Sequence, residues 1–350
     1  MTTSSLNSRG RALDLGVLAG LLLVLVLRGS TSAQVTQVIK LATLAPDGSS
    51  WVQSLRALDA EVREATGGAV GFKIYPGGVQ GDEEVMLRKI RIGQLHGGGF
   101  GGLGVTQVLP DARALAIPFL FDGYDEVDNV LDSTLGYYQD GYEQAGFVLL
   151  GWLDVGFIYL LSRMPLSGAD DIDGAKVWRL QGEPITGALF KKAGVTSVPL
   201  TIPDVLLGLQ TKLVEVVYAS PSAAIVLQWF TRVKYYTDLP INYTVGALLV
   251  DQRTFAKLSP DHQRIVRDVA GRHLARQRAL SRGENEEALR VLDEEGLGRV
   301  APGPAQIEEF RDLVQQCLPE LIGEAFSRQS YDLVLSHLAA YRASASPPKP

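Results

Sequence analysis

Strand-like and helix-like segments alternate after the apolar N-terminus, and this alternation constrains the fold more than any other feature. Residues 38–44 are rich in β-branched and aliphatic side chains, and residues 51–66 carry apolar side chains at helical spacing. A second strand at 70–75 and a second helix at 83–92 repeat the pattern. Strands that alternate with helices predict an α/β sheet whose ligands lie at the carboxyl ends of its strands.

The alternation continues to about residue 250, after which helices predominate. Further strands are expected at residues 114–121, 147–152, 156–161, 176–180, 214–219 and 245–250, and helices at residues 124–131, 184–192, 205–213 and 222–230. Ser259, Pro260 and Asp261 are typical of a helix start, and the pattern behind them predicts one long helix to about Gly296. Residues 306–341 predict further helices, and residues 344–350 a flexible tail.

The N-terminus has the three parts of an export signal. It begins with the basic residues Arg9 and Arg11, continues with the apolar run 15–27, and reaches small residues at Ala33. As a membrane anchor, a helix of the 13 residues in that run would rise only about 20 Å, short of the ~30 Å hydrocarbon core. We therefore predict a signal peptide at residues 1–33, cleaved near Ala33, and a periplasmic mature protein.

Charge and cysteine content exclude several classes of function. Loss of residues 1–33 removes three arginines and one aspartate, so the net charge of −6 becomes −8. That charge disfavours nucleic acid and anionic membrane surfaces as partners. Cys317 is the only cysteine, so neither an intrachain disulfide nor a cysteine-based zinc site can form. Stability in an oxidising compartment must therefore come from the core.

Two motifs suggest further chemistry but have simpler explanations. Residues 99–104 match the dinucleotide pattern G-x-G-x-x-G, yet the segment before them is a poor strand and Pro110 follows within six residues. Asp82, Glu83 and Glu84 are adjacent acids, which a solvated helix start explains better than a metal site. No nucleophile or zinc-protease motif occurs. We expect no cofactor, no metal, no catalytic residue and no enzymatic activity.

Several segments together resemble a known family. They are A-P-D-G-S-S-W (45–51), Y-P-G-G-V-Q-G-D-E-E (75–84), A-I-P-F-L-F (116–121), G-A-K-V-W-R-L-Q-G-E-P (174–184), L-Q-T-K-L-V-E-V-V-Y-A-S-P (209–221) and A-L-L-V-D-Q-R-T-F-A-K-L-S-P-D-H-Q (247–263). In this order they are similar to segments of the solute-binding proteins of TRAP (tripartite ATP-independent periplasmic) transporters, of the dicarboxylate-receptor type. The resemblance covers nearly all of the mature chain.

The resemblance implies a two-lobed periplasmic-binding-protein fold, each lobe a mixed sheet flanked by helices. Lobe I would hold residues 34–155 and 245–285, and lobe II residues 156–244 and 286–343. The chain would cross between them near 154–156 and 243–246, and the long helix would span both. Closure over one small organic solute draws its energy from contacts made only in the closed state. The closed protein would then dock on a TRAP-type membrane permease.

The segment at 174–184 departs from the family pattern. Most members have Gly-x-Lys-apolar-Arg here, and the arginine binds the substrate carboxylate; in this chain Trp178 takes that position. Arg179 follows one residue later, but neighbouring side chains on a strand face opposite sides, so it should not simply replace the missing group. Ile158 stands at a second arginine position of many members, and Tyr218-Ala219-Ser220 stands where many have Glu-Asn.

These departures predict a change of ligand. A buried carboxylate without an arginine partner faces a penalty of several kcal/mol. Aromatic and aliphatic walls instead favour apolar surface, since each buried CH₂ contributes ~0.8 kcal/mol. The sequence therefore predicts an apolar or amphipathic solute, which can still bear a carboxylate, and a branch of the family without its usual carboxylate-binding arginine.

Twelve residues are candidates for ligand contact: Trp178, Ile158, Tyr218, Ser220, Ser49, Ser50, Trp51, Phe100, Gly101, Arg179, Glu183 and Trp229. Several have a structural alternative. The larger apolar side chains would also suit the core. Glu183 would suit a helix start, and Ser49 or Ser50 a helix N-cap. Arg179 would suit the surface or a contact between lobes.

Two other functions remain open. A carrier or sensor subunit could pass an apolar solute to a different partner, such as the helical-repeat protein with which some relatives are thought to work. A secreted enzyme on the same scaffold would need a reactive constellation in the cleft, and none is visible in the sequence. Genomic neighbours would distinguish them, because permease genes favour transport and signalling genes favour sensing.

Overall fold

The computed structural model describes residues 1–2, 37–168 and 170–344. Its strands are β1 (Gln37–Thr43), β2 (Val70–Tyr75), β3 (Gly97–Phe100), β4 (Phe147–Ser162), β5 (Val177–Leu180), β6 (Ser197–Leu200), β7 (Val216–Ala219), β8 (Tyr235–Thr237), β9 (Asn242–Asp251) and β10 (Gly298–Val300). Its α-helices are α2 (Ser50–Ala65), α3 (Glu83–Arg91), α4 (Gly102–Val108), α5 (Tyr124–Gln144), α6 (Pro184–Lys192), α7 (Val205–Gln210), α8 (Pro221–Val226), α9 (Gln252–Phe255), α10 (Pro260–Glu294), α11 (Pro304–Leu321) and α12 (Arg328–Ser344). Four short 3₁₀ helices complete it, at Pro110–Ala116 (η1), Asp170–Ile172 (η2), Ile202–Asp204 (η3) and Trp229–Arg232 (η4).

One mixed sheet runs through the whole molecule, with strand order β2-β1-β3-β9-β4-β7-β5-β6. β1 is parallel to β2 and β3, and β9 is antiparallel to both β3 and β4. The long strand β4 pairs with β9 over most of its length and with β7 and β8 at its end. Strand β4 therefore joins a first lobe, built on β1–β3, to a second lobe, built on β5–β8.

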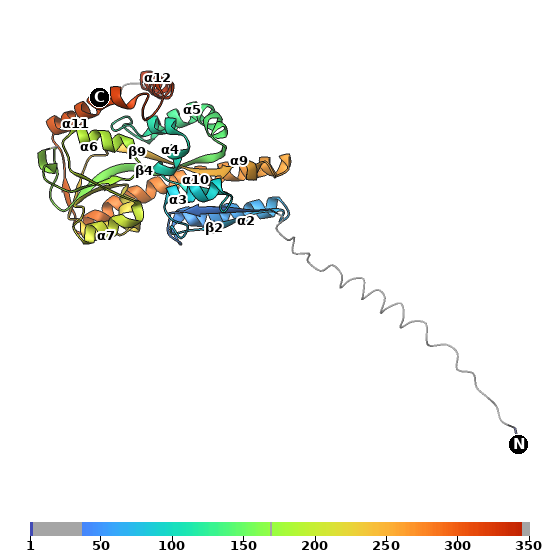
Figure 1. The fold of residues 1–350 in the computed structure, drawn as a ribbon. Coiled ribbons are helices and arrows are strands. Elements are labelled where there is room, and N and C mark those ends of the chain that lie inside the picture. The colour runs from blue at the N-terminus through green and yellow to red at the C-terminus, as the bar shows by residue number, and fades with distance from the viewer. Residues whose placement is uncertain (3–36, 169, 345–350) are drawn as a thin grey trace.

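Helices cover both faces of the sheet (Figure 1). In the first lobe, α2 and α10 pack on one face, and α4, α5 and η1 on the other. Helix α10 also reaches α8 of the second lobe, so the long helix spans both lobes as expected. Helix α12, assigned to lobe II from the sequence, packs against α5 and η1 of the first lobe, whereas α11 packs against α6 (Figure 1).

Local sequence explains where the main helices begin. Ser49 caps α2 by accepting a hydrogen bond from the backbone N–H of Val52, and Ser259 caps α10 from His262 N–H. Pro260 occupies the first turn of α10, where its missing N–H costs nothing. Both starts were expected. Apart from Met1 and Thr2, the predicted signal peptide lies outside the described residues, as do residues 345–350 of the predicted tail; Ser344 ends α12.

Glycines make β3 possible. The sequence analysis considered residues 94–98 a poor strand, which is wrong for Gly97 and Gly98, the first two residues of β3. A Cβ on Gly97 would lie 2.3 Å from the Leu249 carbonyl oxygen, and one on Gly98 would lie 2.7 Å from that of Ala42. Only glycine lets β3 fit between β1 and β9 at this spacing. Helix α4 then opens directly from β3, so Pro110 does not prevent a helix as the sequence suggested.

Two further expectations about secondary structure were wrong. Residues 114–121 form no strand, because Pro110–Ala116 is the 3₁₀ helix η1 and the segment behind it turns at Phe119, with φ of 57°. The backbone N–H of Phe119 donates instead to the carbonyl oxygen of Ile241, the residue just before β9, at 2.9 Å. The two strands expected at 147–152 and 156–161 are one strand, β4, interrupted by register shifts after Leu149 and Asp154.

Candidate functional site

A cavity of about 290 Å³ lies between the two lobes. The first lobe contributes residues of α4 and η1, and β4 contributes Val155, Ile158 and Leu160 where it passes between the lobes. The second lobe contributes β5, α6, β7 and α8, and α11 adds Phe310 and Leu313. Most lining side chains are apolar, and the volume is near the lower limit for a small-molecule site.

An aromatic cluster forms the second lobe's side of the cavity. Trp178 stacks on Tyr218 with ring centroids 4.6 Å apart, and Trp229 meets Trp178 edge-on at 5.2 Å. The indole N–H of Trp178 donates to the Leu200 carbonyl oxygen at 3.0 Å, and the Tyr218 hydroxyl accepts from Leu180 N–H at 2.9 Å. Burial raises the pKa of Tyr218. These hydrogen bonds fix the rings, whose faces remain the apolar part of the wall.

Two polar lining residues are engaged as helix caps. The Glu183 carboxylate accepts from the backbone N–H groups of Ile185 at 3.0 Å and Thr186 at 2.7 Å, and from the Thr186 hydroxyl. Ser220 accepts from Ala223 N–H at 3.4 Å at the start of α8. Glu183 therefore caps the start of α6, as the alternative in the sequence analysis predicted. Its side chain also lines the cavity.

Arg113 also lines the cavity, and the sequence analysis missed it. Its residue exposure is 9%, its Nη1 donates to the Ala325 carbonyl oxygen at 3.1 Å, and its Nε is buried without a hydrogen-bond partner among the described residues. Burial lowers the pKa of this guanidinium, and the charge of Glu183 opposes that effect. The available signal was an arginine among apolar residues in A-R-A-L-A, residues 112–116.

Seven of the twelve candidates line the cavity, and the structure brings them together from both lobes. They are Trp178, Ile158, Tyr218, Ser220, Gly101, Glu183 and Trp229. The other five are not among the lining residues. Phe100, the last residue of β3, is fully buried in the core, and Arg179 is half-buried on β5, beside α6. The opposite orientation of Trp178 and Arg179 expected from strand alternation agrees with these positions.

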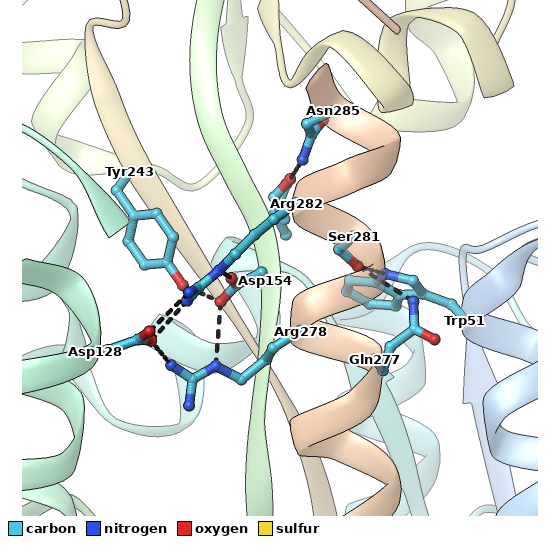
Figure 2. A network of polar contacts seen from close by, with 10 residues as sticks. Trp51, Asp128, Asp154, Tyr243, Gln277, Arg278, Ser281, Arg282 and Asn285 are labelled. Atoms are coloured by element: carbon cyan, nitrogen blue, oxygen red, sulfur yellow. Dashed lines mark hydrogen bonds and ion pairs between the residues drawn. The ribbon is translucent and has the colours of Figure 1, made fainter. Parts of the chain in front are cut away.

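Ser49, Ser50 and Trp51 belong to a contact between α2 and α10. Ser49 is the N-cap of α2, which is the alternative to ligand contact that the sequence analysis gave for Ser49 or Ser50. The Ser50 hydroxyl donates to Glu284 at 2.8 Å, and the Trp51 indole N–H donates to Ser281 at 3.2 Å. Figure 2 shows Trp51, Ser281 and Gln277 in this contact. The Ser50 and Trp51 side chains hold the long helix against the first lobe, and none of the three residues is among those that line the cavity.

Glu83 closes the glycine-rich segment that matches the dinucleotide pattern. Its carboxylate accepts from the backbone N–H of Gly101 and, at 2.7 Å, from that of Gly104, so it fills the N-terminus of α4. Burial raises the pKa of this carboxyl group, and the two amide hydrogen bonds oppose the shift. Glu83 is 3% exposed, so the expectation of a solvated acid was wrong. A protein carboxylate occupies the place that a phosphate would need.

An ion network joins α10 to α5, β4 and β9 (Figure 2). Arg282 donates to Asp154 through Nε at 2.6 Å and to Asp128 through Nη1 at 2.7 Å. Arg278 pairs with Asp128, and the Tyr243 hydroxyl donates to Asp154. Burial raises the pKa of Asp128, but the hydrogen bond from Arg282 and the charges of both arginines bring it below the usual value. Every charge in this ion network has a partner.

Within residues 37–168 and 170–344, no group of three or more His, Cys, Asp or Glu is placed to hold a metal ion. None of the helices in these ranges has the length and apolarity needed to cross a membrane.

The fold and the cavity define a class. Two lobes joined through β4, with an apolar cavity between them and a long helix across both, are the architecture of a two-lobed solute-binding protein. The model of bacterial extracellular solute-binding protein family 7 matches residues 41–324. The chain therefore belongs to this family, the solute-binding proteins of TRAP transporters. Such proteins are periplasmic and carry signal peptides, and they are receptors rather than enzymes.

Relatives and solved structures are similar to this chain over most of their own lengths. The sialic acid-binding periplasmic protein SiaP of Vibrio cholerae is 22% identical, over 85% of this chain and 92% of that protein. The 2,3-diketo-L-gulonate-binding periplasmic protein YiaO of Escherichia coli is 24% identical, over 74% and 81%. A sugar acid binding protein of Advenella mimigardefordensis, solved with galactonate, has a TM-score of 0.81 at 22% identity, covering 88% and 99% of the two chains.

Proposed function

We propose that this protein is the extracytoplasmic receptor of a TRAP-type transporter and captures a small organic solute with an apolar body. The observation that supports this proposal is the lining of the cavity. Its aromatic side is Trp178 stacked on Tyr218, and its aliphatic side includes Ile158 and Leu189. Burial of apolar solute surface in such a cavity contributes ~0.8 kcal/mol for each CH₂ group.

The same lining disfavours the polyhydroxylated acids bound by some relatives. Structures of TRAP solute-binding proteins from Xanthobacter autotrophicus and Citrobacter koseri hold galacturonate and glucuronate. Each sugar hydroxyl needs a hydrogen-bond partner when it is buried. In this cavity Glu183 and Ser220 already serve as helix caps, and the two positions at which many members carry arginine hold Trp178 and Ile158. The solute proposed here therefore has fewer hydroxyl groups than a sugar acid.

Capture would occur by closure of the two lobes. We place lobe I at 34–155 and 245–285 and lobe II at 156–244 and most of 286–343, with hinges near 154–156 and 243–246. The register shift in β4 after Asp154 and the φ of 103° at Gly156 support a hinge at the first of these places. The mature protein, cleaved near Ala33, would deliver its solute to a membrane permease. The named relatives give no support to a helical-repeat partner.

Identification of the bound solute tests the proposal directly. The protein is purified from periplasm without refolding, denatured, and its extract analysed by mass spectrometry. An Ala223→Phe variant places a ring in the cavity wall, and Val226→Phe places the same ring on the exposed part of α8, where Val226 is 48% exposed. We expect an apolar-bodied solute from the wild type and from Val226→Phe, and at least about tenfold less from Ala223→Phe.

Two results would contradict the proposal. Recovery of a short C4-dicarboxylate or a sugar acid would show that the cavity does not select apolar surface. Equal recovery from both phenylalanine variants would place the solute elsewhere. A Trp178→Ala variant that keeps the affinity of the wild type for the recovered solute would likewise remove the aromatic side from the site.

A further inference from the structure

Arg113 differs from the other charged residue that lines the cavity. Glu183 is surrounded by the N–H groups at the start of α6 and by the Thr186 hydroxyl. Arg113 has one hydrogen bond, to a backbone carbonyl, and its Nε has no partner among the described residues. No carboxylate in the described part of the chain lies within ion-pair distance of it, and Glu183 acts on it only from further away.

The local structure holds Arg113 in place. Asp111, two residues before Arg113, accepts hydrogen bonds from the backbone N–H and from the hydroxyl of Ser327, both at 2.8 Å. The Ser330 hydroxyl donates to the Asp111 carbonyl oxygen at 2.9 Å. These contacts fix η1 against the loop before α12, and the bond from Arg113 to Ala325 belongs to the same contact. The guanidinium is therefore positioned before any solute arrives.

A buried cation without an anionic partner is costly for the folded protein. Guanidinium stays charged at all ordinary pH values, so Arg113 cannot escape this cost by losing a proton. The arginines of the ion network, by contrast, are paired: Arg278 and Arg282 both meet Asp128. An unpaired arginine facing a cavity instead fits a group whose partner arrives with the ligand.

We propose that Arg113 binds the carboxylate of the solute, and that the solute is a monocarboxylic acid with an apolar body. This inference rests on the proposed function, because it places the solute in the same cavity. The charge would lie against η1 of the first lobe, opposite the strand position at which most family members carry their arginine and this chain carries Trp178. Among the described residues that line the cavity, Arg113 is the one cationic side chain, so a second carboxylate would find no such partner there and would be repelled by Glu183.

Matched acids and amides test this assignment. The probes are phenylacetate, phenylpropanoate and phenylbutanoate, each with its primary amide, measured by calorimetry on wild-type protein freed of bound solute. Loss of a hydrogen bond to a charged group costs about tenfold or more in affinity. We therefore expect the best acid to bind at least about tenfold more tightly than its amide. In Arg113→Met this preference should disappear, while the affinity for the amide stays within about threefold of the wild type.

Arg163→Met is the matched control. Arg163 also donates from Nη1 to a backbone carbonyl, that of Arg232 at 3.3 Å, but it is not among the residues that line the cavity. This variant should keep the preference for the acid. Equal binding of acid and amide by the wild type, or an unchanged preference in Arg113→Met, would overturn the role of Arg113 and leave the apolar solute standing. Failure of every probe to bind the wild type would contradict the apolar solute itself.

Discussion

The ion network and the cavity both contain arginine side chains that are largely shielded from solvent, and they differ in one respect. In the ion network, Arg278 and Arg282 meet Asp128 and Asp154, and the side chain of Asp154 is fully buried. In the cavity, Arg113 is also buried, with a residue exposure of 9%, but has no anionic partner among the described residues. The same side-chain type thus holds elements together in one region and faces an open cavity in the other. Pairing, more than burial, separates a structural arginine from one available to a ligand.

The position of the ion network explains why its charges are paired. The buried face of α10 is apolar at Val266, Val269 and Leu274, but becomes polar at Gln277, Ser281 and Asn285, where the helix crosses β4. Here Asn285 donates to the Val155 carbonyl oxygen at 3.1 Å (Figure 2). The Arg282 guanidinium lies over the Tyr124 ring, 4.4 Å from its centroid. The paired charges and these hydrogen bonds favour one geometry at this crossing, where only Gln277 Oε1 among the polar side-chain atoms of α10 is buried without a hydrogen-bond partner in the described residues.

Asp154→Ala should have the largest effect on stability. It leaves Arg278, Arg282 and the Tyr243 hydroxyl without their buried acceptor. Removal of one member of a buried charge pair typically costs about 3–5 kcal/mol in the free energy of unfolding. Denaturant unfolding measures the loss. The control Asp47→Ala removes an exposed pair with Arg56 and should leave the midpoint unchanged. A small effect of Asp154→Ala would show that the pairing is dispensable.

Gly156→Ala tests the backbone that brings Asp154 into place. Gly156 has φ of 103°, and a Cβ there would lie 2.4 Å from Nδ2 of Asn285. We expect a loss of about 1–3 kcal/mol in the free energy of unfolding, since both the conformation and the space exclude a side chain. Gly136→Ala in α5 meets nothing within 4 Å and should be neutral or stabilising. Equal losses of stability in Gly156→Ala and Gly136→Ala would show that the backbone conformation of Gly156 in β4 needs no glycine.

Asp128→Asn should show the pH dependence of the ion network. The folded-state pKa of Asp128 is below its ordinary value of 3.8. Its contribution to stability is therefore complete above that value and is lost as the pH falls through the folded-state pKa. At neutral pH the variant should lose about 1 kcal/mol, because the pair is partly exposed, and the difference should shrink as the pH falls below 3.8. Asp132→Asn, exposed on the same helix, is the control. A difference independent of pH would contradict the ionic origin.

The sequence predicted most of the fold, because local patterns determine it. Helices α6 and α10 begin where Pro184 and Ser259 indicated, and the central strands follow their aliphatic runs. The failures lie where long-range packing overrides a local pattern. β3 is four residues of mostly glycine, acceptable only because close neighbours leave no room for side chains. The apolar 114–121 segment looked like a strand, but it takes irregular backbone conformations at the cavity rim.

The candidate site was predictable only where a family pattern marked positions. Trp178, Ile158 and Tyr218 were named because they replace polar residues of relatives, and the structure brings these three together at the cavity. Ser50 and Trp51 were named from their place after a strand, but their side chains turn toward α10. Arg113 has no such marker. Its significance depends on the absence of a partner among the described residues, which no sequence pattern can show.

Arg113→Met should have the smallest effect on the free energy of unfolding. It therefore gives the sharpest contrast with Asp154→Ala. The variant loses one hydrogen bond to Ala325, worth about 1 kcal/mol, but also removes a buried charge without a partner. These terms oppose each other, and we expect the free energy of unfolding of solute-free protein to change by less than about 1 kcal/mol. Denaturant unfolding with Arg163→Met as control measures it. A loss as large as that of Asp154→Ala would make Arg113 a structural arginine and remove the distinction between paired and unpaired charge. A gain in stability would mean that the wild-type protein carries a strained cation, which is the cost expected of a group held ready for a ligand.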